Sequence, residues 1–184
     1  MNVGFLEASK AENFTCFVFH DVDMVPETDW AEYKCPQDRA VRHMAVAVSR
    51  WKYRLTYSRY CGGIIAMSRE NVERINGFSN SFYGWGGEDD DIYNRLTSHN
   101  ITISRYSGNV GRYKMLKHDL VEENPDLKEM MEKSDGAKLL NEGLNTIQYK
   151  VKRTHKFPLY TNIEVELPKP HPKVTNICKD IIFV

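Results

Sequence analysis

The acidic run at residues 88–91 is the strongest candidate for chemistry in the chain. Its four acids, Glu88-Asp-Asp-Asp91, follow a loop in which Trp85 stands between glycines. An aromatic ring between glycines can move as a lid, and its apolar face suits the C–H face of a sugar. Crowded carboxylates raise one another's pKa while a helix N-terminus lowers it, so one acid could accept a proton from a sugar hydroxyl. An acidic helix start behind a flexible turn is the plainer interpretation, but it leaves the glycines around Trp85 unexplained.

A second acidic pair, Asp21 and Asp23, follows the apolar run at 15–20 (TCFVFH). We interpret this run as a buried strand, and alternate residues of a strand point to the same side. Ligands of open α/β sheets bind at the carboxyl ends of strands, so the pair could hold a hard divalent cation there. Taken alone, such a pair is more often a polar strand exit.

Met115 and His118 form a third candidate, at the end of an expected strand at 112–116. The imidazole of His118 is a common metal ligand. The thioether of Met115 is a soft ligand, and manganese prefers oxygen and imidazole. The chemistry of this segment alone favours a core histidine, and it does not suggest Met115 as a ligand.

The elements that would position these residues are a mixture of helices and strands. Gly62 and Gly63 leave space where another group approaches the backbone, Ser68 caps a helix, and Asn76-Gly77 ends it. This order predicts an α/β layer structure. The expected helices lie at 3–12, 69–75, 88–98 and 124–133, and the expected strands at 15–20, 43–49, 60–67, 101–105, 112–116 and within 146–167 around Pro158.

Composition narrows the class of protein. The chain has 184 residues, 41% of them hydrophobic, which suits one domain at 1–167 followed by a tail at 168–184. Lys and Arg total 25, as do Asp and Glu, so no net field favours nucleic acid. Four cysteines lack the paired spacing of a zinc site, which leaves free thiols or disulfides. Asn13 and Asn100 begin N-glycosylation sequons.

Taken together, four segments resemble the β-1,4-galactosyltransferase family over residues 2–165. They are CFVFHDVDMVP, YCGGIIAMSRENVERINGFSN, FYGWGGEDDDIYNRL and GRYKMLKH, in this order and spacing. The resemblance implies an α/β fold of the GT-A nucleotide-sugar transferase type, a Rossmann-like mixed sheet flanked by helices. It implies an inverting, Mn²⁺-dependent transfer of galactose from UDP-galactose to a terminal N-acetylglucosamine, in β-1,4 linkage, on glycoprotein or glycolipid glycans.

The resemblance also implies roles for individual residues. Asp89 would be the catalytic base with Glu88 beside it, and Trp85 would be the lid. The metal ligands would be Asp23, Met115 and His118, and Cys16 would pair with Cys35, leaving Cys61 and Cys178 as free thiols. The UDP-sugar would contact Asp21, Val22, Asp23, Arg50 and Trp85, and the acceptor would contact Tyr57, Tyr60, Gly63, Trp85, Glu88, Asp89 and Asp90.

Two other functions stay open. Tyr60 aligns with a position where tyrosine excludes an N-acetyl group, which favours UDP-galactose over the donor of a β-1,4-N-acetylgalactosaminyltransferase. An inactive, truncated sugar-binding relative is the alternative from another class. The family's Golgi membrane anchor, stem, N-terminal strands and upstream donor-binding motifs are expected to precede Met1. The resemblance therefore implies a Golgi-lumen enzyme whose contact with membrane is an N-terminal anchor outside this sequence.

Overall fold

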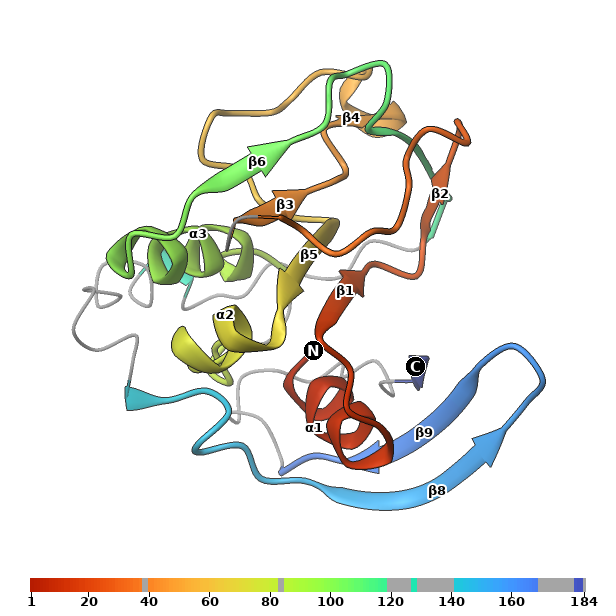
Figure 1. The fold of residues 1–184 in the computed structure, drawn as a ribbon, viewed down its shortest axis with the longest axis vertical. Helices are drawn as coiled ribbons and strands as arrows, with labels where there is room; N and C mark the ends of the chain where they lie inside the picture. Colours follow the sequence, from red (N-terminus) through yellow and green to blue (C-terminus); the bar gives the residue numbers. More distant parts are fainter. Residues whose placement is uncertain (38–39, 83–84, 119–126, 129–140, 169–180, 184) are drawn as a thin grey trace.

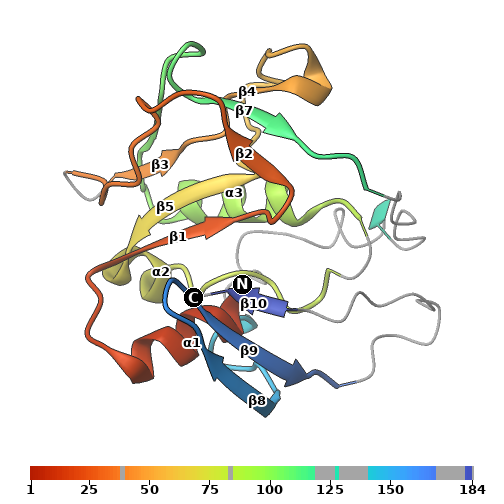
Figure 2. The same cartoon turned by 90° about the vertical axis from the view of Figure 1, so that its right-hand side faces the viewer.

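The computed structural model describes residues 1–37, 40–82, 85–118, 127–128, 141–168 and 181–183. In the described ranges, three helices contribute to the core on one face of a central mixed sheet, and two smaller sheets lie on opposite sides of it (Figures 1 and 2). The helices are α1 (Asn2–Ala11), α2 (Arg69–Arg74) and α3 (Glu88–Ser98). The expected helix at 124–133 and Cys178 lie mostly or wholly outside the described residues. No helix in the described ranges is long and apolar enough to span a bilayer.

The central sheet has the strand order β1-β5-β3-β6. Strands β1 (Cys16–His20) and β3 (Val41–His43) run antiparallel to β5 (Ile64–Ser68), and β6 (Ile103–Arg105) runs parallel to β3. Successive residues of β5 point to opposite faces, so Ile65 and Met67 join the core beneath α2 and α3 while Ile64 and Ala66 join a second core. Both faces of β5 are therefore buried, which explains its continuous apolar sequence.

The second sheet has the order β2-β7-β4 and leads into the metal-ligand candidates. Strand β7 (Arg112–Met115) pairs antiparallel with β2 (Met24–Pro26) and parallel with β4 (Ala47–Val48). The expected continuous strand at 43–49 is wrong. The chain leaves the central sheet after His43, where Met44 N–H donates to the Ile64 carbonyl, and it enters the second sheet at Ala47. The apolar residues at 43–49 suit a strand in either sheet, so the sequence pattern does not show that the strand partner changes within this segment.

Helix α2 and the strand before it show how the glycines act. Ser68 Oγ accepts a hydrogen bond from Asn71 N–H, which confirms the predicted cap. Asn76 and Gly77, with φ of 58° and 68°, end the helix as predicted. Gly63 has φ of 79°, so β5 begins after it rather than at residue 60.

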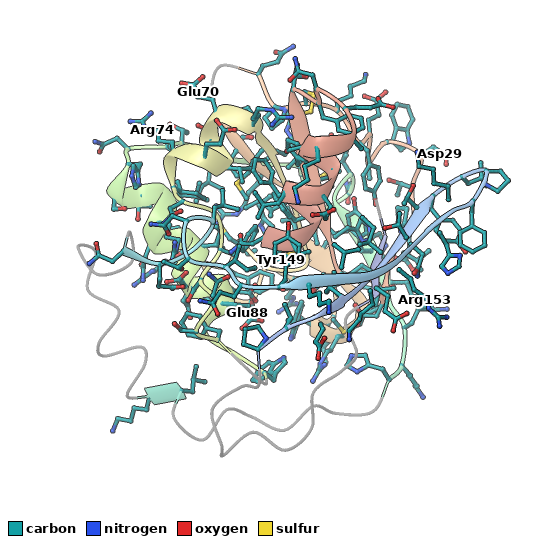
Figure 3. All side chains as sticks on the ribbon, turned by 90° about the horizontal axis from the view of Figure 1, so that it is seen from below. Asp29, Glu70, Arg74, Glu88, Tyr149 and Arg153 are labelled. Carbon is teal, nitrogen blue, oxygen red and sulfur yellow. A yellow bond between two sulfur atoms is a disulfide. The ribbon has the colours of Figure 1, made fainter. Side chains whose placement is uncertain are left out.

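The third sheet pairs β8 (Lys150–Lys156), β9 (Thr161–Glu166) and β10 (Ile181–Phe183). It confirms the two strands expected around Pro158, and β10 shows that the end of the expected tail adds a strand to β9. Figure 3 shows Tyr149 beneath α1. Tyr149 Oη lies 2.6 Å from Glu7 Oε1 and accepts from Lys10 Nζ at 3.0 Å, which connects this sheet to α1.

Candidate active site

The acidic pair at 21 and 23 lies beside the start of β5. Asp21 N–H donates to the Gly63 carbonyl (2.9 Å), and Met24 N–H donates back to the Asp21 carbonyl (3.1 Å). The residues therefore form a turn between β1 and β2, and their placement in a strand is wrong because the chain passes here from the central sheet to the second sheet. The two carboxylates are nevertheless close enough to interact, since burial and the charges of Asp23 and Glu88 raise the pKa of Asp21 to about 7. Val22 is 80% exposed at the tip of the turn.

Asp89 meets this turn from the first turn of α3. Its carboxylate lies directly against Gly62, so closely that a Cβ on Gly62 would overlap it. Burial, followed by the charges of Glu88, Asp21 and Asp90, raises the pKa of Asp89 to about 8. The N-terminus of α3 favours the ionised form, but burial outweighs it. The group expected to approach the glycine pair is thus Asp89 itself.

Two tyrosines form the wall beside these acids. The buried ring of Tyr60 makes edge contacts with His43, Trp51 and Tyr57, at centroid distances of 5.4, 5.3 and 5.7 Å. Burial and the charges of Asp89 and Asp21 raise the pKa of Tyr60 above its usual range, so its hydroxyl faces the acids in its protonated form. Tyr57 is half-exposed, and its hydroxyl interacts with the Asp90 carboxylate.

The metal-ligand candidates converge on the other side of the turn. His118 Nε2 lies 3.2 Å from Asp23 Oδ2, and Leu116 N–H donates to the Asp23 carbonyl at 2.7 Å. The pairing of β2 with β7 places Met115 opposite Met24, and Arg50 Nη1 lies 3.9 Å from Met115 Sδ. Two strands and the segment after them therefore bring together residues that lie far apart in the sequence.

This donor set fits a divalent cation such as Mn²⁺. A carboxylate oxygen and an imidazole nitrogen 3.2 Å apart are close enough to bind one ion, and both are donors that manganese accepts. In the described ranges, no group of three or more His, Cys, Asp or Glu side chains is arranged so that it could hold a metal ion. The expected set does not require one, because its third member is the thioether of Met115.

The loop before α3 ends in two glycines with left-handed backbone. Gly86 and Gly87 have φ of 105° and 90°, and a Cβ on Gly87 would overlap the ring of Phe82 and the side chain of Leu127. Side chains other than glycine are therefore disfavoured at this position. Trp85, just before them, is 53% exposed. Whether this ring closes over a ligand stays a prediction.

A buried ion-pair network ties the start of the same loop to α3. Arg95 Nε donates to Asp91 Oδ2 (2.7 Å) and Arg95 Nη2 donates to Glu142 Oε1 (3.0 Å), while Glu142 Oε2 accepts from Asn80 N–H (2.7 Å). The sequence analysis missed this network. Asp91 and Arg95 lie four residues apart on a helix, and this spacing could have predicted the ion pair between them. The partner Glu142 comes from a distant segment.

The cysteines and sequons complete the predicted residues. Cys16 and Cys35 form a disulfide, which confirms the pairing implied by the resemblance and closes the segment that carries Asp21 and Asp23. Cys61 is a buried free thiol whose pKa is raised to about 12 by burial. Asn13 and Asn100 are exposed, and their glycosylation stays a prediction.

Comparisons with known proteins agree with this arrangement. Residues 42–119 match the model described as the N-terminal domain of galactosyltransferase, and residues 1–36 match the N-terminal region of glycosyl transferase group 7. Human β-1,4-galactosyltransferase 1 is 41% identical over 172 residues, which cover 92% of this chain and 43% of that protein. Mouse β-1,4-galactosyltransferase 4 is 43% identical over 170 residues, covering 90% and 48%. The chain thus spans less than half the length of these relatives.

Solved structures give the same result for the fold. The catalytic domain of Drosophila β-1,4-galactosyltransferase 7 in complex with xylobiose has a TM-score of 0.76 and 26% identity, over 94% of this chain and 75% of that one. An aspartate-to-asparagine mutant of the same enzyme, in complex with manganese, UDP-Gal and xylobiose, matches with a TM-score of 0.76 and 25% identity. With its GT-A fold and its matches over most of its length, the chain belongs to the β-1,4-galactosyltransferase family of glycosyltransferases.

Proposed function

We propose that this chain carries the catalytic residues for transfer of galactose from UDP-galactose to a sugar hydroxyl, with inversion at the anomeric carbon. The observation that carries the proposal is the Asp89 carboxylate, which lies half-buried against Gly62 among other acids and has its pKa raised to about 8. The ionised form of such a carboxyl is a stronger base than an ordinary carboxylate, and a pKa near the working pH suits a general base. The manganese, UDP-Gal and xylobiose bound by a structural neighbour support the same substrate classes.

Asp89 acts on the acceptor in this mechanism. Its carboxylate takes the proton of the acceptor hydroxyl as that oxygen attacks the anomeric carbon, and the bond to the UDP oxygen breaks on the opposite face. A single displacement of this kind inverts the configuration, and no covalent enzyme intermediate forms. Asp23, Met115 and His118 would hold Mn²⁺, which when bound neutralises the charge on the diphosphate leaving group.

The neighbouring residues orient the two sugars. Glu88, Asp90 and Tyr57 offer carboxylate and hydroxyl groups to an acceptor, and Trp85 offers an apolar ring to its C–H face. Asp21, Val22 and Arg50 would contact the UDP-sugar. For the acceptor we propose a terminal N-acetylglucosamine, and for the location the Golgi lumen. The Cys16–Cys35 disulfide supports an oxidising compartment.

The test is release of UDP from UDP-galactose in the presence of free N-acetylglucosamine, with and without Mn²⁺. The proposal expects release that requires both the acceptor and the metal. The assay is run on the 184-residue chain and on a version extended upstream, because the relatives are more than twice as long. Sugar binding without turnover in either form would favour the non-catalytic sugar-binding alternative.

The choice of donor gives a prediction at Tyr60. We expect Tyr60→Leu to raise the use of UDP-N-acetylgalactosamine relative to UDP-galactose by about tenfold or more, because the smaller side chain leaves room for the N-acetyl group. Competition between the two donors measures the ratio. Tyr60→Phe keeps the ring and should keep the preference for UDP-galactose. An unchanged ratio in Tyr60→Leu would remove Tyr60 from donor selection.

A second prediction concerns the contact between Gly62 and Asp89. We expect Gly62→Ala to lower kcat about 100-fold, because the added Cβ displaces the base by a fraction of an ångström or more. Gly108→Ala is the matched control, since a Cβ there would have no atom within 4 Å. Binding of UDP with Mn²⁺ should be the same in both variants. A kcat within threefold of wild type in Gly62→Ala would show that this contact does not position the base.

A further inference from the structure

A buried histidine–arginine pair lies behind the backbone that supports Asp89. His43, fully buried at the end of β3, has its Nε2 atom 3.0 Å from the Gly62 carbonyl. Arg105, which lies opposite His43 in the parallel pairing of β3 with β6, places its Nε atom 3.3 Å from His43 Nδ1. Neither residue belongs to the acid cluster, and the proposed mechanism does not use them.

The arginine determines which nitrogen of His43 carries the proton. A guanidinium can only donate hydrogen bonds, so His43 Nδ1 accepts from Arg105 and the proton resides on Nε2. Nε2–H therefore donates to the Gly62 carbonyl, which also accepts from Ile64 N–H at 3.0 Å. Burial and the charge of Arg105 lower the pKa of His43 to about 4, so this neutral form persists at neutral pH.

Arg105 also contacts the backbone directly. Its Nη2 donates to the carbonyls of Ser58 (2.8 Å) and Tyr60 (3.1 Å). Together the pair holds three carbonyls of the segment 58–62, which lies outside helices and strands and contains a glycine. Removing these donors takes one hydrogen bond each from the partly buried Tyr60 carbonyl and the Gly62 carbonyl, so the segment would shift or loosen.

We propose that His43 and Arg105 are positioning residues, which hold the backbone at 58–62 so that Tyr60 faces the acids and the Asp89 carboxylate rests against Gly62. The proposal rests on the proposed role of Asp89 as the base. It predicts a loss in the chemical step rather than in donor binding, because the hydrogen bonds given above join the pair to each other and to the segment that carries Gly62.

The experiment compares His43→Leu with His43→Gln in the full chain. Leucine fills most of the ring's volume without hydrogen bonds, whereas the glutamine amide offers one donor and one acceptor. We expect His43→Leu to lower kcat about 30-fold or more with KM for UDP-galactose within threefold, as for a misplaced catalytic group. His43→Gln should recover kcat to within about fivefold of wild type. His99→Leu is the matched control, since the hydrogen bonds given for the His99 ring go to Ser98 and Arg95 at the end of α3.

Hydrogen exchange of the amides at 57–64 gives a readout that does not depend on activity. His43→Leu should speed exchange in this segment about tenfold relative to His99→Leu, and His43→Gln should restore it. Arg105→Lys retains the charge but loses the forked arrangement of donors, so it should also speed exchange in this segment. It replaces His43→Leu in the experiment if that variant does not fold. Unchanged exchange, or kcat equal to wild type in an active enzyme, would overturn the positioning role. Absence of transfer in wild type would instead refute the proposed function, and the exchange result would still decide whether the pair holds this segment.

Discussion

Asp89→Asn is expected to abolish galactose transfer, with kcat reduced about 1,000-fold or more, while binding of UDP and Mn²⁺ is retained. Asparagine keeps the shape of the side chain against Gly62 but cannot accept the proton of the acceptor hydroxyl. General base catalysis contributes about 10²–10⁴-fold, and the upper part of this range applies to a buried base held in position. Steady-state UDP release measures kcat, and calorimetry measures UDP binding with Mn²⁺.

The matched control for this substitution is Asp29→Asn, an aspartate at the exposed surface (Figure 3). It should leave both turnover and binding unchanged. Equal turnover in Asp89→Asn and wild type would remove Asp89 from the role of base, and loss of UDP binding would show that the side chain has a different role.

Asp89→Asn should also be more stable than wild type when no ligand is bound. The pKa of Asp89 is raised to about 8 in the folded chain, whereas an unfolded aspartate has a pKa near 4. The folded state therefore binds more protons between these two values, so Asp89 lowers the free energy of unfolding as pH rises from about 4 to about 8. Asparagine does not ionise, and the gain in melting temperature should be larger at pH 8 than at pH 5. A lower melting temperature than wild type at pH 8 would contradict the raised pKa of Asp89 in the folded chain.

His118→Ala is expected to weaken Mn²⁺ binding about 10-fold to 100-fold, because the imidazole beside the Asp23 carboxylate is removed. Electron paramagnetic resonance of Mn²⁺ in the presence of UDP measures the affinity without requiring turnover. The Mn²⁺ concentration that gives half-maximal transfer should rise by a similar factor, whereas kcat at saturating metal should fall less.

His155→Ala on the exposed strand β8 is the control for this experiment, since its side chain lies on the third sheet. Its Mn²⁺ affinity should equal that of wild type. An unchanged affinity in His118→Ala would exclude the imidazole from the ligand set and leave Asp23 to bind the metal with other groups.

Local sequence signals predicted the elements around the site closely. Helix α3 spans the expected residues, because four acids in the first turn and a preceding glycine mark its start. The Ser68 cap and the Asn76-Gly77 stop were predicted for the same reason: each depends on a hydrogen bond or backbone angle set by neighbouring residues. The strand at 43–49 was wrong because its pairing partners lie elsewhere in the chain.

The sequence by itself determined the residue types of the site, namely the acids at 88–91, the acids at 21 and 23, and Met115 with His118. Only the tertiary structure decided how far the pKa of Asp89 is raised, because burial and the charge of Asp21, which comes from another element, contribute to the shift. It also decided that His43 and Arg105 hold the backbone at 58–62. Burial and hydrogen bonds between distant segments exist only once the sheets have formed, so no local pattern records them.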